Sequence, residues 1–250
     1  METASSSLSP WKTIERRMLT REGLILHTPE IKNALPQLST VKSCAMIGCG
    51  TGHIELPFIR ESFPNLTELA AVEPDADQMA GFKINVSQQI PSVNVDFYQE
   101  TAQNWEGSSG KLFDAVLLFH CLYHVRPSER PVLFKKLFDH VVVSGGVVLI
   151  LIHPCDMQNP KGIDRLIWNL DVGGVQISDT MTSVGFKESY QLAIECQVDV
   201  QEPNDDLMST IVVWNKDKLS LEEVRLAAKE EFGSMKIAPH EDWFGAFRKP

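Results

Sequence analysis

The feature that most constrains this chain is the run A-M-I-G-C-G-T-G-H-I-E-L at residues 45–56. An apolar strand-like stretch leads into Gly48, Gly50 and Gly52, and a helical pattern follows. Glycines at this spacing allow a tight backbone turn and let a ligand approach where a Cβ would obstruct it. The unpaired N–H groups at the start of the following helix would face the same point. The run therefore predicts a strand, a ligand-binding loop and a helix.

A second apolar stretch ends in an acidic residue, Glu73, which lies 21 residues beyond Gly52. An acid at the tip of the second strand of such a unit can accept hydrogen bonds from both hydroxyl groups of a ribose. The pair of features predicts an adenosine-containing cofactor.

The rest of the chain repeats the alternation of strand and helix. Apolar runs occur at 44–48, 69–73, 93–98, 113–120 and 146–153, and helical patterns at 53–62, 75–90, 128–141, 162–170 and 178–184. This alternation predicts an α/β fold with a mostly parallel sheet and helices on both faces. The stretches 115–119 and 147–152 are apolar throughout, as expected for central strands.

Two helices are expected before the sheet, at 11–26 and 29–35, with Thr28 and Pro29 starting the second. After the sheet come segments at 189–200 and 210–214, and a helix at 221–232 that has a capping box, Ser220 and Glu223, and a terminating Gly233. We expect a disordered arm at 1–10 and one domain at 11–250. Within it, 11–40 forms a helical cap, 41–200 the cofactor-binding core and 201–250 a modified C-terminal segment.

Composition excludes several classes of protein. The net charge is −10 and no basic cluster occurs, which argues against nucleic-acid binding. No apolar run reaches the ~18–20 residues of a membrane span, and the first residues do not resemble a signal peptide. The five scattered cysteines are typical of a reducing compartment. We expect a cytoplasmic monomer that acts on a small molecule.

The loop also separates two kinds of adenosine cofactor. A dinucleotide fingerprint, G-x-G-x-x-G, needs its third glycine at position 53, which is His53. The spacing G-x-G-x-G instead resembles class I S-adenosylmethionine (SAM)-dependent methyltransferases. A dinucleotide enzyme and a glycine-rich turn without a ligand stay open as alternatives.

A closer resemblance rests on four stretches: IGCGTGHIELPF, AVEPDADQM, the Glu-Thr pair at 100–101 and FDAVLLFHCLYHV. Over roughly residues 14–200 the chain resembles the histamine N-methyltransferase family. Ser144, Gly145 and Gly146 resemble the turn before the fifth strand of class I enzymes. The resemblance implies a Rossmann-like sandwich with a seven-stranded sheet, an N-terminal helical cap, and SAM as the cofactor.

The resemblance and the loop together give the expected cofactor contacts. They are Gly48, Cys49, Gly50, Gly52, Glu73, Pro74, Gln78, Thr101, Ala102 and Phe119. Ala102 replaces a serine of the relatives, so only its backbone or methyl group is available there. Asp75 is expected to cap the following helix rather than to touch the ligand, and Cys49 to pack without being activated.

The acceptor half of the site departs from the family. Tyr123 and His124 occupy the place of a tyrosine pair, and the family's amine-binding acid aligns on Gly23, next to Glu22. The family's C-terminal asparagine has Gly245 as its nearest match, and we expect the closing strand to be missing or remodelled. The candidate acceptor-site residues are Glu22, His120, Tyr123, His124, His153 and Trp168.

No metal site is expected, because the run H-C-L-Y-H at 120–124 lacks the glutamate of H-E-x-x-H and begins at a strand end. No residue is assigned a catalytic role, since an activated methyl group requires alignment more than acid–base chemistry. The sequence therefore predicts methyl transfer to a small amine. The alternatives are an oxygen or carboxylate acceptor, or a cofactor-binding module without amine methyltransferase activity.

Overall fold

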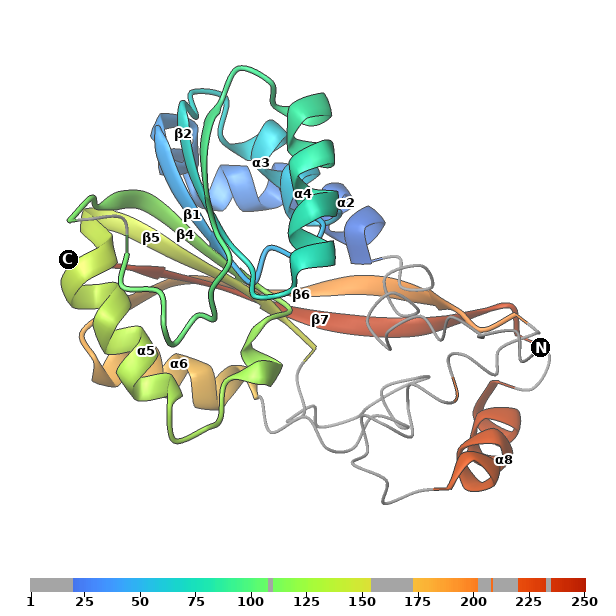
Figure 1. Ribbon diagram of the computed structural model, residues 1–250. Helices are drawn as coiled ribbons and strands as arrows, with labels where there is room; N and C mark the ends of the chain where they lie inside the picture. The colour runs from blue at the N-terminus through green and yellow to red at the C-terminus, as the bar shows by residue number, and fades with distance from the viewer. Residues whose placement is uncertain (1–19, 108–109, 154–172, 202–207, 209–219, 233–234) are drawn as a thin grey trace.

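A computed structural model describes residues 20–107, 110–153, 173–201, 208, 220–232 and 235–250 (Figure 1). The chain forms a seven-stranded sheet in the order β3-β2-β1-β4-β5-β7-β6. The strands are β1 (Ser43–Ile47), β2 (Glu68–Val72), β3 (Asn94–Tyr98), β4 (Phe113–Phe119), β5 (Val142–Ile152), β6 (Lys187–Asp199) and β7 (Ile237–Arg248). Strands β1 to β5 pair in parallel, and β7 is antiparallel to both β5 and β6. The predicted mostly parallel sheet is confirmed.

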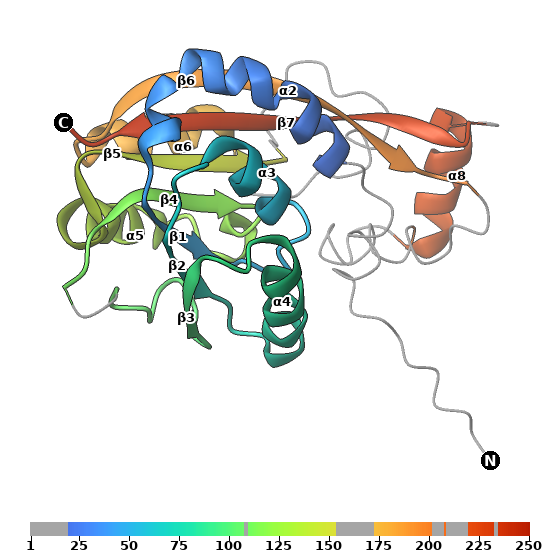
Figure 2. The ribbon, with the colours of Figure 1, turned by 90° about the horizontal axis from the view of Figure 1, so that it is seen from above.

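Helices cover both faces of this sheet, as predicted (Figure 2). One apolar core joins the sheet to α2 (Thr20–Ala34), α3 (Glu55–Ser62) and α4 (Ala76–Gln89). The other joins it to α5 (Arg130–Lys136) and α6 (Gly174–Ser183). In the described part of the chain, no helix is both long and apolar enough to cross a membrane.

The continuous apolar runs of the central strands are explained by these two cores. In β4, Val116 and Leu118 enter the core with α5 and α6, whereas Leu117 and Phe119 enter the core with α3 and α4. Successive side chains of a strand point to opposite faces, so a strand covered on both sides needs apolar residues at every position.

The remaining elements of the described residues are short helical turns and one further helix. They are the 3-10 turns η1 (Pro36–Thr40) and η2 (Leu122–His124), the π-helical turn η3 (Leu137–Val141) that continues α5, and the helix α8 (Leu221–Phe232). The capping box before α8 is confirmed, because the Ser220 backbone N–H donates to Glu223 Oε2 at 2.7 Å and the Glu223 N–H donates to Ser220 Oγ at 3.2 Å.

The expected break between two N-terminal helices is wrong over the residues that the structure describes. Helix α2 runs without interruption through Pro29. Thr28 does not cap a new helix, since its hydroxyl donates to the Leu24 carbonyl at 2.8 Å, one turn back in the same helix. Residues 11–19, which would begin the expected cap, lie outside the described residues, as do the expected elements at 162–170 and 210–214 and Gly233.

The glycine turn expected before the fifth strand lies inside β5. Phe113 pairs with Val142 but Ala115 pairs with Val147, so β5 carries extra residues at this point and bulges. Gly145 has a φ of +83°, which a glycine adopts without strain. The Gly145 N–H and the Gly146 carbonyl bond to Lys249, so the end of β7 holds the bulge.

The closing strand, expected to be missing or remodelled, is present as β7. It runs between β5 and β6, and Ile152 at the end of β5 pairs with Trp243. Residues 237–242 of β7 extend past that point while still paired with β6. The hairpin of β6 and β7 therefore overhangs the sheet at the carboxyl end of β5 (Figure 1).

Gly23 allows α2 to pack tightly on this hairpin. A Cβ at position 23 would lie 2.6 Å from the Glu195 carbonyl oxygen and 2.8 Å from Cys196 Sγ, both on β6. Position 23, where the amine-binding acid of the histamine N-methyltransferase family aligns, therefore has no space for an acidic side chain.

Gly23→Ala tests this packing through the sign of its effect. At an unconstrained helical position the change would stabilise the fold by about 1 kcal/mol. Here the overlap with β6 is expected to lower the free energy of unfolding, by about 1–3 kcal/mol from overpacking. Chemical denaturation measures the change, with Glu22→Ala, an exposed neighbour, as the control. An increase in stability in Gly23→Ala would contradict the close contact.

Candidate functional site

The loop after β1 has the backbone conformation that its glycines predict. Gly48, Gly50 and Gly52 have φ values of +67°, +51° and +74°, all in the left-handed region. A Cβ at Gly48 would lie 2.4 Å from Cys121 Cβ, and one at Gly52 would lie 2.8 Å from the Phe82 ring. A Cβ at Gly50 would meet nothing within 4 Å. Close packing against neighbouring side chains therefore requires glycine at positions 48 and 52, whereas Gly50 faces open space.

Glu73 lies at this loop, as predicted. Its buried carboxylate accepts the Gly50 N–H on Oε2 at 2.9 Å and the Asp75 N–H on Oε1 at 3.0 Å. A carboxylate offers about four acceptor positions, so each oxygen keeps one for a further donor. An open cradle at Gly50 beside a fixed carboxylate fits an adenosine cofactor whose ribose hydroxyls donate to Glu73.

Asp75, two residues after Glu73, caps the N-terminus of α4, as predicted. Its Oδ1 accepts the N–H groups of Asp77 and Gln78, each at 2.9 Å. Asn85 on α4 donates to the Thr51 carbonyl at 2.9 Å, which ties this helix to the glycine loop. Gln78 lies half-buried in the first turn of α4, and Pro74 is exposed at the turn before it.

Cys49 is buried within the loop, and it is not activated. Burial raises the pKa of its thiol well above the ordinary value, and the carboxylates of Glu55 and Glu73 raise it further. Cys121 behaves in the same way, for the same causes. Both are packing residues, as expected for Cys49.

Thr101 and Ala102 lie in the turn after β3. Lys136 of α5 fixes this turn by donating to the carbonyls of Ala102 and Gln103 at 3.0 Å and of Trp105 at 2.7 Å. Burial lowers the pKa of the Lys136 ammonium, and Glu106 and Glu100 oppose that shift.

Phe119 is the last residue of β4, and it is only 2% exposed. Its ring packs against Phe58 at 5.6 Å and Phe244 at 6.4 Å between centroids. The structure thus places it in an aromatic cluster below the carboxyl edge of the sheet.

His120 follows Phe119 and has a φ of +48°, the one positive value among the described residues other than glycine. Strained backbone of this kind persists only where its surroundings hold it, often at functional sites. Its backbone N–H donates to the Leu151 carbonyl at 2.7 Å, and its Nδ1 lies 3.1 Å from the Tyr123 hydroxyl. The Tyr123 oxygen also accepts the backbone N–H of His153. The Tyr123 hydroxyl therefore links the His120 ring to the backbone of His153.

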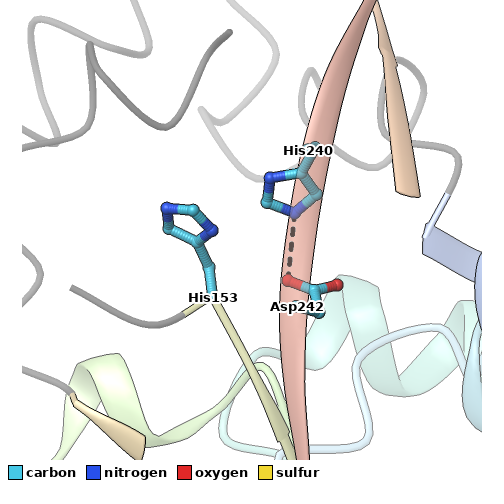
Figure 3. A group of neighbouring side chains, drawn as sticks. All are labelled: His153, His240 and Asp242. Carbon is cyan, nitrogen blue, oxygen red and sulfur yellow. Dashed lines mark hydrogen bonds and ion pairs between the residues drawn. The ribbon is translucent and has the colours of Figure 1, made fainter. Parts of the chain in front are cut away.

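Two residues of β7 join this edge, and the sequence analysis did not predict them. Asp242 is fully buried, with its Oδ1 3.0 Å from His240 Nε2 and its Oδ2 3.4 Å from His120 Nε2. Burial alone would raise the pKa of the Asp242 carboxyl, but the imidazoles of His240 and His120 outweigh it and hold that pKa well below its ordinary value. A carboxylate thus lies buried among imidazoles (Figure 3).

The structure brings together three of the six candidate acceptor-site residues: His120, Tyr123 and His153. His124 is exposed nearby, where its partial burial lowers the pKa of its imidazole and Glu73 opposes the shift. Glu22 is exposed on α2. Trp168 lies outside the described residues. Gly245, the nearest match to the family's asparagine, lies under the Trp243 ring, which is 2.2 Å from where a Cβ would be.

The fold and the site together indicate a class I SAM-dependent methyltransferase. Comparison with known families agrees, since residues 45–146 match the methyltransferase domain family. No curated protein sequence matches the chain significantly. SAM is accordingly the cofactor of this site.

Solved structures share the fold at low identity. A methyltransferase of Bacillus halodurans, described as putative in its own title, is 12% identical, with a TM-score of 0.60 over 86% of this chain and 97% of that one. The N-methyltransferase NodS of Bradyrhizobium japonicum is 13% identical, with a TM-score of 0.53 over 89% and 96%. The cyclase SpnF is 13% identical, with a TM-score of 0.56 over 88% and 80%. At such identities the likeness concerns the fold alone.

Gly50→Val tests the open cradle. The variant is expected to fold, since no atom lies within 4 Å of the new Cβ, with a loss of about 1–2 kcal/mol for a left-handed residue other than glycine. The valine would occupy the space of the ligand, so affinity for S-adenosylhomocysteine should fall by more than about tenfold, a loss of 1.4 kcal/mol. Calorimetric titration measures it.

Gly110→Val is the matched control, because Gly110 also has a positive φ, +83°, and open space around its Cβ. It lies before β4, at the opposite edge of the sheet, so binding should be unchanged there. Glu73→Ala is expected to lose binding as well. Retained affinity in both Gly50→Val and Glu73→Ala would refute the assignment of this site.

Proposed function

We propose that this protein transfers a methyl group from SAM to a small amine, in the manner of the histamine N-methyltransferase family. The observation that carries the proposal is the pairing of the open backbone at Gly50 with the fixed carboxylate of Glu73. The acceptor would lie at the carboxyl ends of β4 and β5, because ligands of open α/β sheets bind at that edge.

The remaining cofactor contacts follow from position. Gly48, Cys49 and Gly52 would contribute backbone, Gln78 and Pro74 would flank the ribose, and Thr101, Ala102 and Phe119 would border the adenine and the apolar part of the pocket. Lys136 supports this by fixing the turn that holds Ala102.

The chain's own residues would mainly orient the two reactants. When SAM is bound, its sulfonium supplies an already activated methyl group. Glu73 holds the sugar, and the buried strand ends exclude water. His120, Tyr123 and His153 line the edge where the acceptor's lone pair must meet the methyl group. Such alignment can supply roughly 7–11 kcal/mol of the barrier, so no nucleophilic residue is required.

Two alternatives keep the same cofactor. Fold relatives include both an N-methyltransferase and a domain titled as an O-methyltransferase, so an oxygen or carboxylate acceptor is the second candidate. The third is a module that binds the cofactor without methylating amines, which the lack of space for an acid at Gly23 favours. We also expect a monomer in the cytoplasm, a compartment that suits the free, buried cysteines of the described residues, Cys44, Cys49, Cys121 and Cys196.

Methyl transfer from labelled SAM to a panel of small amines, phenols and carboxylic acids tests the proposal. We expect turnover on at least one amine and less on matched phenols and acids. If Glu22 anchors a cationic acceptor, Glu22→Gln will raise KM for that amine without changing kcat. Tight S-adenosylhomocysteine binding without turnover on any amine would favour the third candidate.

Tyr123→Phe tests the acceptor edge. The change removes the hydroxyl that joins His120 Nδ1 to the His153 backbone N–H, so the His120 ring and the His153 backbone lose a shared support. We expect kcat/KM for the acceptor to fall by about 10- to 100-fold, or roughly 1.4–2.7 kcal/mol. S-adenosylhomocysteine affinity should not change, because the hydroxyl bonds to His120 and His153, which are assigned to the acceptor side. An equal loss of both would assign Tyr123 a general structural role.

A further inference from the structure

The overhang of β7 places two of its residues against the end of β5. Ile152, the last residue of β5, pairs with Trp243, so His153 emerges beside Asp242 and His240. These two lie two positions apart on β7 and share one face of the strand. The three side chains are buried: His153 is 4% exposed, His240 3% and Asp242 0%.

Their ligand atoms lie close together. One nitrogen of each histidine and one oxygen of Asp242 are all within 4.8 Å of one another. Ligand atoms of a tetrahedral zinc ion, each about 2.0–2.1 Å from the metal, lie roughly 3.3 Å apart. His240 Nε2 and Asp242 Oδ1, at 3.0 Å, already have nearly that separation. His153 needs a shift of at most about 1.5 Å to complete the set.

The outer contacts of this cluster orient its members. Asp242 Oδ2 faces His120 Nε2 at 3.4 Å and accepts a hydrogen bond from Cys196 Sγ at 3.7 Å, whereas Oδ1 faces His240. The His153 ring stacks on His240, with 4.7 Å between centroids, and its Nδ1 lies 3.3 Å from the Glu241 carbonyl oxygen. Second contacts of this kind typically hold metal ligands in place.

We propose that His153, His240 and Asp242 bind one divalent transition-metal ion, and that zinc is the ion this donor set favours. Two imidazoles and a carboxylate suit zinc, and three protein ligands leave a fourth position open. The ion would balance the buried negative charge of Asp242 and fasten the overhang of β7 to the end of β5. No metal is expected from the sequence, because the run H-C-L-Y-H at 120–124 lacks a metal motif and His240 and Asp242 lie far along the chain from His153.

Cobalt titration of the full chain, stripped of metal with a chelator, tests the site. We expect one Co²⁺ per chain, with visible absorption bands of low-symmetry nitrogen and oxygen ligation, and displacement of the bands by Zn²⁺. Zn²⁺ should also raise the Tm, because an ion that binds the folded state stabilises it. The readout needs neither an acceptor nor turnover, so it is independent of the proposed function.

Three variants assign the ligands. His153→Gln and Asp242→Asn should each lower Co²⁺ affinity by at least about tenfold, the lower limit seen even for outer contacts of metal sites. His27→Gln, a histidine of α2 that pairs with Glu30 instead, should bind as the wild type does. His153→Gln serves alone if Asp242→Asn fails to fold. Wild-type protein that binds no more Co²⁺ than His153→Gln would overturn the proposal and reduce the cluster to a hydrogen-bonded network.

Discussion

The hydrogen bond from the Gly50 N–H to the Glu73 carboxylate is the interaction on which the candidate site depends. It joins the loop after β1 to the end of β2, at 2.9 Å. A buried carboxylate is costly unless its lone pairs are satisfied, and Glu73 meets this demand with two backbone N–H groups that the turns themselves present. The same bonds fix the carboxylate at the mouth of the loop before any ligand arrives. Ligand binding then costs little conformational entropy, because the site is already ordered.

The second constraint is the direction of β7. Parallel strands all end at one edge of the sheet, which is where the loops after β1, β2 and β4 meet. An antiparallel strand begins at that edge instead, so residues 237–242 of β7 extend over it. His240 and Asp242 therefore lie at this edge because β7 runs antiparallel to β5. The polar groups at the edge thus come both from the ends of parallel strands and from the start of an antiparallel one.

Prediction from sequence succeeded where the signal is local. The loop glycines, the acid after β2 and the cap Asp75 each follow from a short spacing that admits one backbone geometry. It failed where the outcome depends on distant contacts. Thr28 and Pro29 predict a helix start, yet α2 continues through them. Its buried face, which includes Leu24 and Ile31, packs in the core with α3 and α4 and keeps the helix continuous. Likewise His240 and Asp242 carry no motif. They share the even-numbered face of a strand with buried Phe244 and Ala246, but only pairing with β5 puts that face beside His153.

The two halves of the site carry unequal information about function. The cofactor half uses backbone and one carboxylate, which carry no information about the acceptor. Proteins that share this fold include an N-methyltransferase and a cyclase. The acceptor half uses side chains, and here the chain differs from the histamine N-methyltransferase family that its sequence resembles. β6 leaves no space for a side chain at position 23, where that family's amine-binding acid aligns, and an imidazole–carboxylate cluster lies at the edge instead. A buried carboxylate surrounded by histidines needs an acceptor or ion that tolerates polar, hydrogen-bonding neighbours. We therefore expect the residues that select the acceptor to lie on the β7 overhang rather than in the glycine loop.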